Sequence, residues 1–419
     1  MPHLRLASGM AAAVAIITLV ASGAYLYGTS RPGPDGSALG PGPAASRMSW
    51  SGWQVVANPF PGAMDAATAP PNYTPRIFSL AGGGFVAFVP YELDAGGDPS
   101  ITNSQWGLGA MYVPSETRVY TSADGLAWIQ KSVLDNSLVS SIAESGGVTV
   151  AVGSSIDVAG QAETPTAWST RDFQNWTERQ IGTPGGPIGS QVVADPTGFL
   201  AWGGSMDRPD SEGFWASPDG ARWTQMFETG LPTNVGSAEV LAVPGGYAIY
   251  GYLGNTQAIW QSGDGSVWEE VWTGPEPSEL ASYLLGQSFS AVGGGYISFG
   301  AYQVADATGQ VGTQQSDIVV WTGTDLVHWN VSAQVHPPGW IDSYAAVRGR
   351  YLAAGNQPRS GDHESYLAIW TSVDGKEWQS AASLPIEGAG PVSVVSDGTH
   401  VVIPFERSLG GYCLAVSRI

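Results

Sequence analysis

Residues 369–378 read IWTSVDGKEW, and this pattern of an aromatic residue, an Asp four positions later and a Trp four positions beyond it occurs six times. The other copies are VYTSADGLAW (119–128), AWSTRDFQNW (167–176), FWASPDGARW (214–223), IWQSGDGSVW (259–268) and VWTGTDLVHW (320–329). A motif that returns at intervals of roughly 45 to 60 residues indicates one supersecondary unit copied along or around an array. We therefore expect a repeat architecture.

Each copy has the pattern of a β-hairpin. Apolar residues alternate up to a small polar residue or Gly, a short turn follows, and alternation resumes at the Trp. In four copies a Gly that can take positive φ follows the Asp, whose carboxylate can accept turn amides. These glycines are Gly125, Gly220, Gly265 and Gly375. Phe173 and Leu326 stand at this position in the other two copies, where we expect another turn geometry.

These hairpins resemble the Asp-box, or bacterial neuraminidase repeat, whose pattern is Ser/Thr-x-Asp-x-Gly-x-x-Trp or Ser-x-Asp-Gly-x-x-Trp. The resemblance covers most of the chain beyond the N-terminal tail and implies a sialidase-like β-propeller. In that family the box joins the two outer strands of a blade, away from the active face, with its Trp packed between blades. The resemblance therefore implies a structural role for Asp124, Asp172, Asp219, Asp264, Asp325, Asp374, Trp128, Trp176, Trp223, Trp268, Trp329 and Trp378.

A second pattern, an apolar strand, a Gly turn and another apolar strand, occurs seven times, from FSLAGGGFVAFV (78–89) to VVSDGTHVVIPF (394–405). The chain ends at Ile419 before the last copy can add a fourth strand, and SWSGWQVV (49–56) can supply that strand. We therefore predict an all-β fold, a seven-bladed β-propeller of four-stranded antiparallel blades over residues 49–419. An N-terminal strand would close the ring and remove its open edges. Eight blades stay open if residues 90–115 contain strands.

The first 48 residues predict a separate targeting region. Leu6 to Gly28 carry no charge and are long enough to span a bilayer as a helix, so residues 1–28 predict a transmembrane anchor. The alternative is a signal sequence cleaved after Ala24, which would give a secreted protein. Residues 29–48, rich in Pro, Gly, Ser and Ala, predict a flexible linker. Both alternatives export the propeller, because the positive N-terminus stays inside.

Composition excludes one class of partner. The net charge of −20, from 36 acidic and 16 basic residues, leaves no basic patch to offset it, so we expect no nucleic-acid binding. The 57 Gly and 17 Trp with 12% charged residues suit short strands and tight turns. Cys413 is the single cysteine, which excludes an intramolecular disulfide, and its apolar strand predicts a buried thiol. We expect a monomer.

The functional face is expected opposite the boxes, where the connections differ in length. Alignment of the inner strands by their Gly turns places Arg76, Ser190, Gln287 and Asp342 at equivalent entrances to the central channel, with Glu239 one position along. Trp340 and Tyr344 flank Asp342, and aromatic rings beside a carboxylate suit sugar binding. The alternative is that Trp340 and Tyr344 pack the blade and Asp342 caps a turn.

We expect no cofactor, with Ca²⁺ as the one alternative. Glu92, Asp94 and Asp98 lie close together in a Gly-containing segment, and hard oxygen ligands on such a loop can hold Ca²⁺. The spacing differs from that of an EF-hand loop. These residues are therefore candidate metal ligands.

Two functions are compatible with these patterns. The first is a non-catalytic module, tethered to the membrane or secreted, whose loop face binds a protein or a carbohydrate. The second is a glycosidase of the sialidase-like type that acts on a neutral sugar through two carboxylates, with Asp342 and Glu239 as catalytic candidates. The resemblance implies three inner-face Arg residues for a true sialidase, and only Arg76 is suitably placed. The sequence therefore favours the binding module.

Overall fold

The computed structural model describes residues 52–61, 63, 74–92, 114–157, 162–183, 188–205, 208–226, 230–232, 235–253, 256–274, 281–283, 289–292, 295–304, 317–335, 340–358, 365–384, 393–406 and 412–419. Within these ranges the chain forms strands and turns and no helix. Accordingly, the described part of the chain offers no helix with the length and hydropathy of a membrane span. The predicted anchor (1–28) and linker (29–48) lie outside it.

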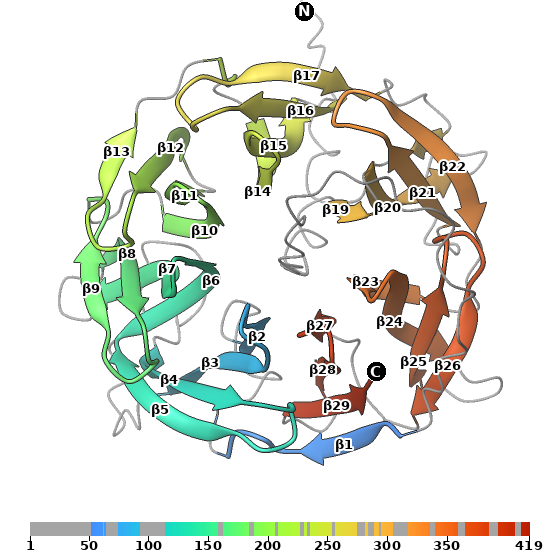
Figure 1. Ribbon diagram of the computed structural model, residues 1–419, viewed down its shortest axis with the longest axis horizontal. Coiled ribbons are helices and arrows are strands. Elements are labelled where there is room, and N and C mark those ends of the chain that lie inside the picture. Colours follow the sequence, from blue (N-terminus) through green and yellow to red (C-terminus); the bar gives the residue numbers. More distant parts are fainter. Residues whose placement is uncertain are drawn as a thin grey trace, which may run out of the picture.

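The strands form seven sheets, which we number as blades one to seven in chain order (Figure 1). Blade one contains β2 (Arg76–Ser79), β3 (Phe85–Glu92), β4 (Pro114–Ser122) and β5 (Ile129–Asp135). Blade two contains β6 (Ser137–Ser145), β7 (Val148–Asp157), β8 (Ala162–Thr170) and β9 (Thr177–Gln180). Blade three contains β10 (Ile188–Asp195), β11 (Gly198–Ser205), β12 (Arg208–Ser217) and β13 (Thr224–Met226). Blade four contains β14 (Val235–Val243), β15 (Gly246–Leu253), β16 (Thr256–Ser262) and β17 (Glu269–Thr273).

The remaining blades follow the same order. Blade five contains β18 (Ala281–Tyr283), β19 (Phe289–Val292), β20 (Gly295–Val304), β21 (Asp317–Gly323) and β22 (Trp329–Val335), and β18 and β19 both pair with β20. Blade six contains β23 (Trp340–Val347), β24 (Arg350–Pro358), β25 (Ser365–Ser372) and β26 (Gln379–Leu384). Blade seven contains β27 (Val395–Ser396), β28 (His400–Glu406), β29 (Tyr412–Arg418) and β1 (Gln54–Ala57).

The prediction of a seven-bladed all-β propeller with four-stranded antiparallel blades is confirmed. In each blade the first strand lies nearest the axis and the last on the rim (Figure 1). β1 pairs antiparallel with β29, from Gln54 opposite Val416 to Ala57 opposite Cys413. Strands from the two ends of the described chain therefore share blade seven.

The antiparallel order gives every blade two different ends. One end carries the turns between first and second strands and, in blades one to six, the repeated Asp turns between third and fourth strands, which we call boxes; we call this end the box end. The other end carries the connections between second and third strands and between blades; we call it the loop end. The predicted separation of the boxes from the variable connections follows from this strand order.

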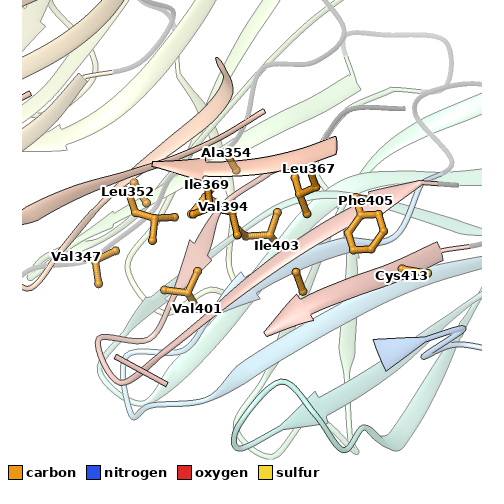
Figure 2. Close-up of a cluster of buried hydrophobic side chains, with 12 residues drawn as sticks. Val347, Leu352, Ala354, Leu367, Ile369, Val394, Val401, Ile403, Phe405 and Cys413 are labelled. Atoms are coloured by element: carbon orange, nitrogen blue, oxygen red, sulfur yellow. The ribbon is translucent and has the colours of Figure 1, made fainter. Parts of the chain in front are cut away.

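The hydrophobic core lies between adjacent blades. Figure 2 shows one cluster, in which Leu352 and Ile369 of blade six meet Val401 and Ile403 of blade seven. Cys413 is buried in the same cluster, as its apolar strand predicts. Apolar side chains that alternate along each strand thus cover both faces of a blade, and each face is buried against a neighbour.

Each box turn packs against the preceding blade. The ring of Trp378 in blade six lies 5.6 Å from that of Phe299 in blade five, and Trp268 in blade four lies 5.5 Å from Phe214 in blade three. Gly220 has a φ of 75°, and a Cβ there would lie 2.5 Å from Val150 Cγ2 of blade two. Both the backbone conformation and the close approach therefore require Gly at this position.

Candidate functional site

The first box shows how the Asp holds its turn. Asp124 Oδ1 accepts the backbone N–H groups of Leu126 at 2.9 Å and Ala127 at 3.3 Å. The Ser hydroxyl two residues before the Asp accepts the N–H of Gly125 at 2.8 Å, and the indole N–H of Trp128 donates to the Gly125 carbonyl at 3.0 Å. The carboxylate is thus engaged by its own turn.

The other boxes repeat these contacts. The carboxylates of the remaining five Asp residues each accept the amides two and three positions later. Hydrogen bonds from these amides lower the pKa of Asp172 and Asp219 to about 2, because they stabilise the ionised form. An ionised carboxylate occupied by turn amides is unsuited to proton transfer at neutral pH.

The two boxes without Gly differ from one another. Phe173 takes a left-handed φ of 59°, and its N–H donates to Thr170 Oγ1 at 3.0 Å, as a Gly would. Our expectation of another geometry is therefore wrong at Phe173. Leu326 does not take a positive φ, yet Asp325 Oδ1 still accepts the amides of the residues two and three positions later at 2.8 and 2.7 Å. The hydrogen bonds from the turn amides to the Asp carboxylate are therefore present in both boxes that lack the Gly.

At the loop end, the innermost strands carry a repeated β-bulge. Ser190 in β10 and Asp342 in β23 are both the extra residue of such a bulge, and β6 and β14 are irregular at the matching point. Arg76 was predicted to be equivalent to Ser190 and Asp342. Its pairing with Phe88 shows instead that it matches the residue after the bulge. The prediction is wrong by one residue, because strand pairing sets the register and the first blade has a longer inner turn.

The residue after each bulge defines a set of equivalent positions, which we call the bridging positions. They hold Arg76, Ser141, Gln191, Glu239 and Ser343 in blades one, two, three, four and six. In three blades the side chain accepts a backbone amide of the next blade, within or just before its innermost strand. These bonds are Val192 N–H to Ser141 Oγ at 3.2 Å, Val240 N–H to Gln191 Oε1 at 2.7 Å, and Val394 N–H to Ser343 Oγ at 2.9 Å. The bridging positions therefore join neighbouring blades.

Ser141, Gln191 and Ser343 could not be recognised from the sequence of their own strands, because a polar residue in an apolar strand has no pattern of its own. A signal was nevertheless present in the second strand, where an apolar run ends at a Gly such as Gly153 or Gly355. In blades two, three, four and six the bridging residue lies opposite the residue just before that Gly. Pairing the two strands on this Gly would have located these four positions.

The two catalytic candidates differ in their surroundings. Glu239 is half-buried, and burial raises its pKa to about 8. Asp342 is exposed and accepts the Asn356 side-chain amide at 3.1 Å, and partial dehydration raises its pKa to about 6. Leu241, two residues beyond Glu239 on the same face of β14, packs with Trp321 of blade five. Glu239 therefore faces the seam between blades four and five.

The remaining candidates separate into described and undescribed residues. Tyr344 packs its ring 4.2 Å from that of Phe299 in blade five, and its hydroxyl accepts the Phe299 amide at 3.4 Å, so it has a packing contact between blades. Trp340 begins β23, but its side chain is not described, and Gln287 lies outside the described residues. Figure 1 places β23 near the axis, which leaves Asp342 as the described candidate exposed there.

The predicted metal site cannot be placed. Glu92 ends β3 with no described side chain, and Asp94 and Asp98 lie outside the described residues. In the part of the chain that the structure describes, no three His, Cys, Asp or Glu residues gather as a metal site would require. Ca²⁺ binding by these three residues stays a prediction.

Comparisons with known proteins found distant similarities to solved structures alone. No protein-family model matches the chain, and no curated protein matches its sequence. Similar solved structures include the WD40 β-propeller domain of Doa1, which is 10% identical with a TM-score of 0.45 over 88% of this chain and 98% of that one. The α-L-arabinofuranosidase Arb93A from Fusarium graminearum, solved with an iminosugar inhibitor, is 10% identical with a TM-score of 0.41 over 87% and 98%. A chain of the Mitotic Checkpoint Complex is 13% identical with a TM-score of 0.45 over 95% and 99%.

Proposed function

We propose that the chain is an extracytoplasmic β-propeller of the Asp-box type, tethered by residues 1–28 or secreted, that binds a protein or a carbohydrate at its loop end. The proposal includes closure of the ring by the N-terminal strand. It gives the six boxes a structural role and leaves the ligand to the opposite end. A rigid frame with varied connections on one side is the usual arrangement for a binding module.

The contrast between the two ends is the observation that supports binding. At the box end, all six Asp-box turns have one length and one pattern of Asp hydrogen bonds. At the loop end, the connections between second and third strands range from residues 254–255 in blade four to residues 93–113 in blade one. Uniform turns serve folding, whereas connections that differ between blades present different chemistry to a ligand.

A glycosidase is the second candidate, and the raised pKa values of Glu239 and Asp342 are the observation that favours it. At neutral pH a carboxyl group with a pKa of about 8 is protonated and one with a pKa of about 6 is ionised, as an acid and a base or nucleophile require. Glu239, however, faces the seam between blades, whereas Asp342 is exposed. A pair that does not face one space favours binding over hydrolysis.

Matched charge reversals test the binding module. The full chain, purified in detergent, would be screened on a glycan array, and ligands would be measured again with Asp342→Lys at the loop end and Glu377→Lys at the box end. Both side chains are exposed acids, so the two variants change net charge equally. We expect Asp342→Lys to weaken binding roughly tenfold, about 1.4 kcal/mol, and Glu377→Lys to leave it unchanged.

Enzyme assays provide the opposing test. The same full chain would be incubated with chromogenic glycosides of neutral sugars, alongside Asp342→Asn and Glu239→Gln. We expect no turnover. Turnover that both substitutions abolish, with a maximum between pH 6 and 8, would replace the binding module with the glycosidase.

A further inference from the structure

Glu239 stands at a position that joins blades elsewhere in the molecule. In blades two, three and six, the bridging side chain is a neutral Ser or Gln that accepts an amide of the next blade. In blade four the same position holds an acid, opposite Tyr250 on β15. The fold therefore places an acid where blades two, three and six use neutral hydrogen-bonding groups.

The partner amide can be located by register. The amide of Val240 bonds the bridging side chain of blade three, and Val240 pairs with Ile249, two residues before Gly251. In blade five the corresponding residue of the second strand is Ser298, two residues before Gly300, and it pairs with Phe289. The backbone amide of Phe289 is therefore the counterpart of the amides that bond the bridging positions elsewhere.

The direction of the Glu239 side chain agrees with this assignment. Alternate residues of a strand share one face, so Glu239 and Leu241 face the same neighbour. Leu241 packs with Trp321, Leu326 and Trp329, all of blade five. Glu239 therefore faces the strands to which Phe289 belongs.

Among the described residues, the surroundings of Glu239 offer no compensating charge. Strands β10, β15 and β20 contribute the titratable groups Asp195, Tyr247, Tyr250, Tyr252, Tyr296 and Tyr302, of which the side chains of Tyr252 and Tyr302 are not described, and β19 reads FSAV and contributes none. Asp195 accepts amides at the box end, and burial raises the pKa of Tyr247 and Tyr296, which therefore stay neutral. The Tyr250 hydroxyl accepts the Gln257 side-chain amide at 2.5 Å. Among described groups, burial alone shifts the pKa of Glu239, to about 8.

We propose that Glu239 is a protonation-dependent bridge between blades four and five. As a neutral carboxyl group it accepts the amide of Phe289 and closes the seam, as Ser141 and Ser343 do in their blades. As a carboxylate it brings into the seam a charge that one amide cannot compensate, because an ionised carboxylate has about four acceptor sites. Water then enters, and the loop end of the inner strand of blade five loosens.

The sign of the pH dependence follows from linkage. The folded pKa of about 8 lies above the ordinary value of 4.5, so the folded chain keeps a proton that the unfolded chain releases. The stabilisation is fully present below about pH 4.5 and is lost as the pH rises to about 8. Alkaline conditions therefore weaken this seam and leave the neutral bridges of blades two, three and six unaffected.

The isosteric substitution Glu239→Gln in the full chain tests the bridge. Gln accepts the same amide but does not titrate, so the melting temperature of the wild type should fall relative to the variant by roughly 5 °C between pH 5 and pH 8. Hydrogen exchange of residues 289–292, compared between the two proteins at each pH, should be faster in the wild type at pH 8 and equal at pH 5. The inner strands of the other blades should show no difference.

Gln191→Glu provides the converse experiment, because it places an acid at the bridging position of blade three. This variant should lose stability relative to the wild type as the pH rises, with faster exchange in residues 239–243. Parallel pH profiles for the wild type and Glu239→Gln would overturn the proposal. Faster exchange spread evenly over all the inner strands would overturn it as well, since it would show that the acid acts on no particular seam.

Discussion

The box end and the loop end of each blade join neighbours by different means. At the box end, six turns use the same Asp contacts, and apolar rings such as Trp378 pack on the preceding blade. At the loop end, the bridging position holds Arg, Ser, Gln or Glu in different blades, and in blades two, three and six its Ser or Gln bonds the next blade. Uniform chemistry at one end builds the frame, and variation at the other is available for function.

Deletion of residues 49–57 is expected to have the largest effect on this frame. It removes β1, leaves β29 as an open edge and takes Trp53 from its packing on the cluster of blades six and seven. We expect a loss of roughly 5 kcal/mol or more, enough to abolish a cooperative unfolding transition. Circular dichroism during heating would measure it, with deletion of linker residues 31–39 as the control. An unchanged transition would contradict closure of the ring by this strand.

The next effect separates the two ends directly. Trp370 is fully buried at the start of the sixth box, and Trp370→Ala should cost about 3–5 kcal/mol through the cavity that it leaves. Ser343 is also buried, but Ser343→Ala removes a single bridge to the Val394 amide and should cost about 1–3 kcal/mol. Urea denaturation of both variants provides the measurement. Equal losses would show that the loop end contributes as much to the frame as the box end.

The frame could be predicted because its signal repeats. Apolar alternation, the Asp turn and the Trp recur in six copies, so an irregular copy such as the one at Phe173 is corrected by the others. The missing box of blade seven was also informative, because it pointed to residues 49–56 as the source of the fourth strand. In the structure, residues 54–57 form β1 and pair with β29.

The register of residues at the loop end could not be predicted from the sequence, for a physical reason. Loop-end positions were counted from the inner turns at the box end, and these turns differ in length, from residues 80–84 in blade one to residues 348–349 in blade six. A bulge then adds one residue without a sequence signature. Alignment by turns therefore placed Arg76 one residue out of register. Asp342 was located correctly on an innermost strand, but the seam-facing direction of Glu239 depends on packing that involves residues of blade five.

A smaller effect tests the close approach at the box turns. Gly220→Ala combines strain at a φ of 75° with a Cβ placed 2.5 Å from Val150, whereas Gly146→Ala has a φ of 57° and no neighbour within 4 Å. Both variants carry the cost of a left-handed Ala, about 1 kcal/mol. Gly220→Ala should cost roughly 1–3 kcal/mol more, because it overpacks the contact with blade two. Thermal unfolding would measure the difference. Equal losses of stability in the two variants would show that Val150 of blade two moves to accommodate the added Cβ.

The smallest expected effect is on the pH dependence of stability, and it compares one Asp from the box end with one from the loop end. Amides of its turn lower the pKa of Asp219 to about 2, so its stabilisation is present above its ordinary value of 3.8 and is lost as the pH falls. Dehydration raises the pKa of Asp342 to about 6, so ionisation of Asp342 costs stability as the pH rises from 3.8 to about 6.

Asp→Asn at each site should therefore give pH dependences of opposite sign. Relative to the wild type, Asp219→Asn should become less stable as the pH rises from 2 to 4, because only the carboxylate strengthens the turn bonds and pairs with Arg222. Asp342→Asn should become more stable relative to the wild type between pH 4 and 6, since the neutral amide avoids the dehydrated charge. Both shifts should stay below about 1 kcal/mol, because each side chain is accessible to solvent. Urea denaturation from pH 2 to pH 8 measures both stability differences between variant and wild type. If the two differences change with pH in the same direction, the two ends do not shift the pKa of a carboxylate in opposite directions.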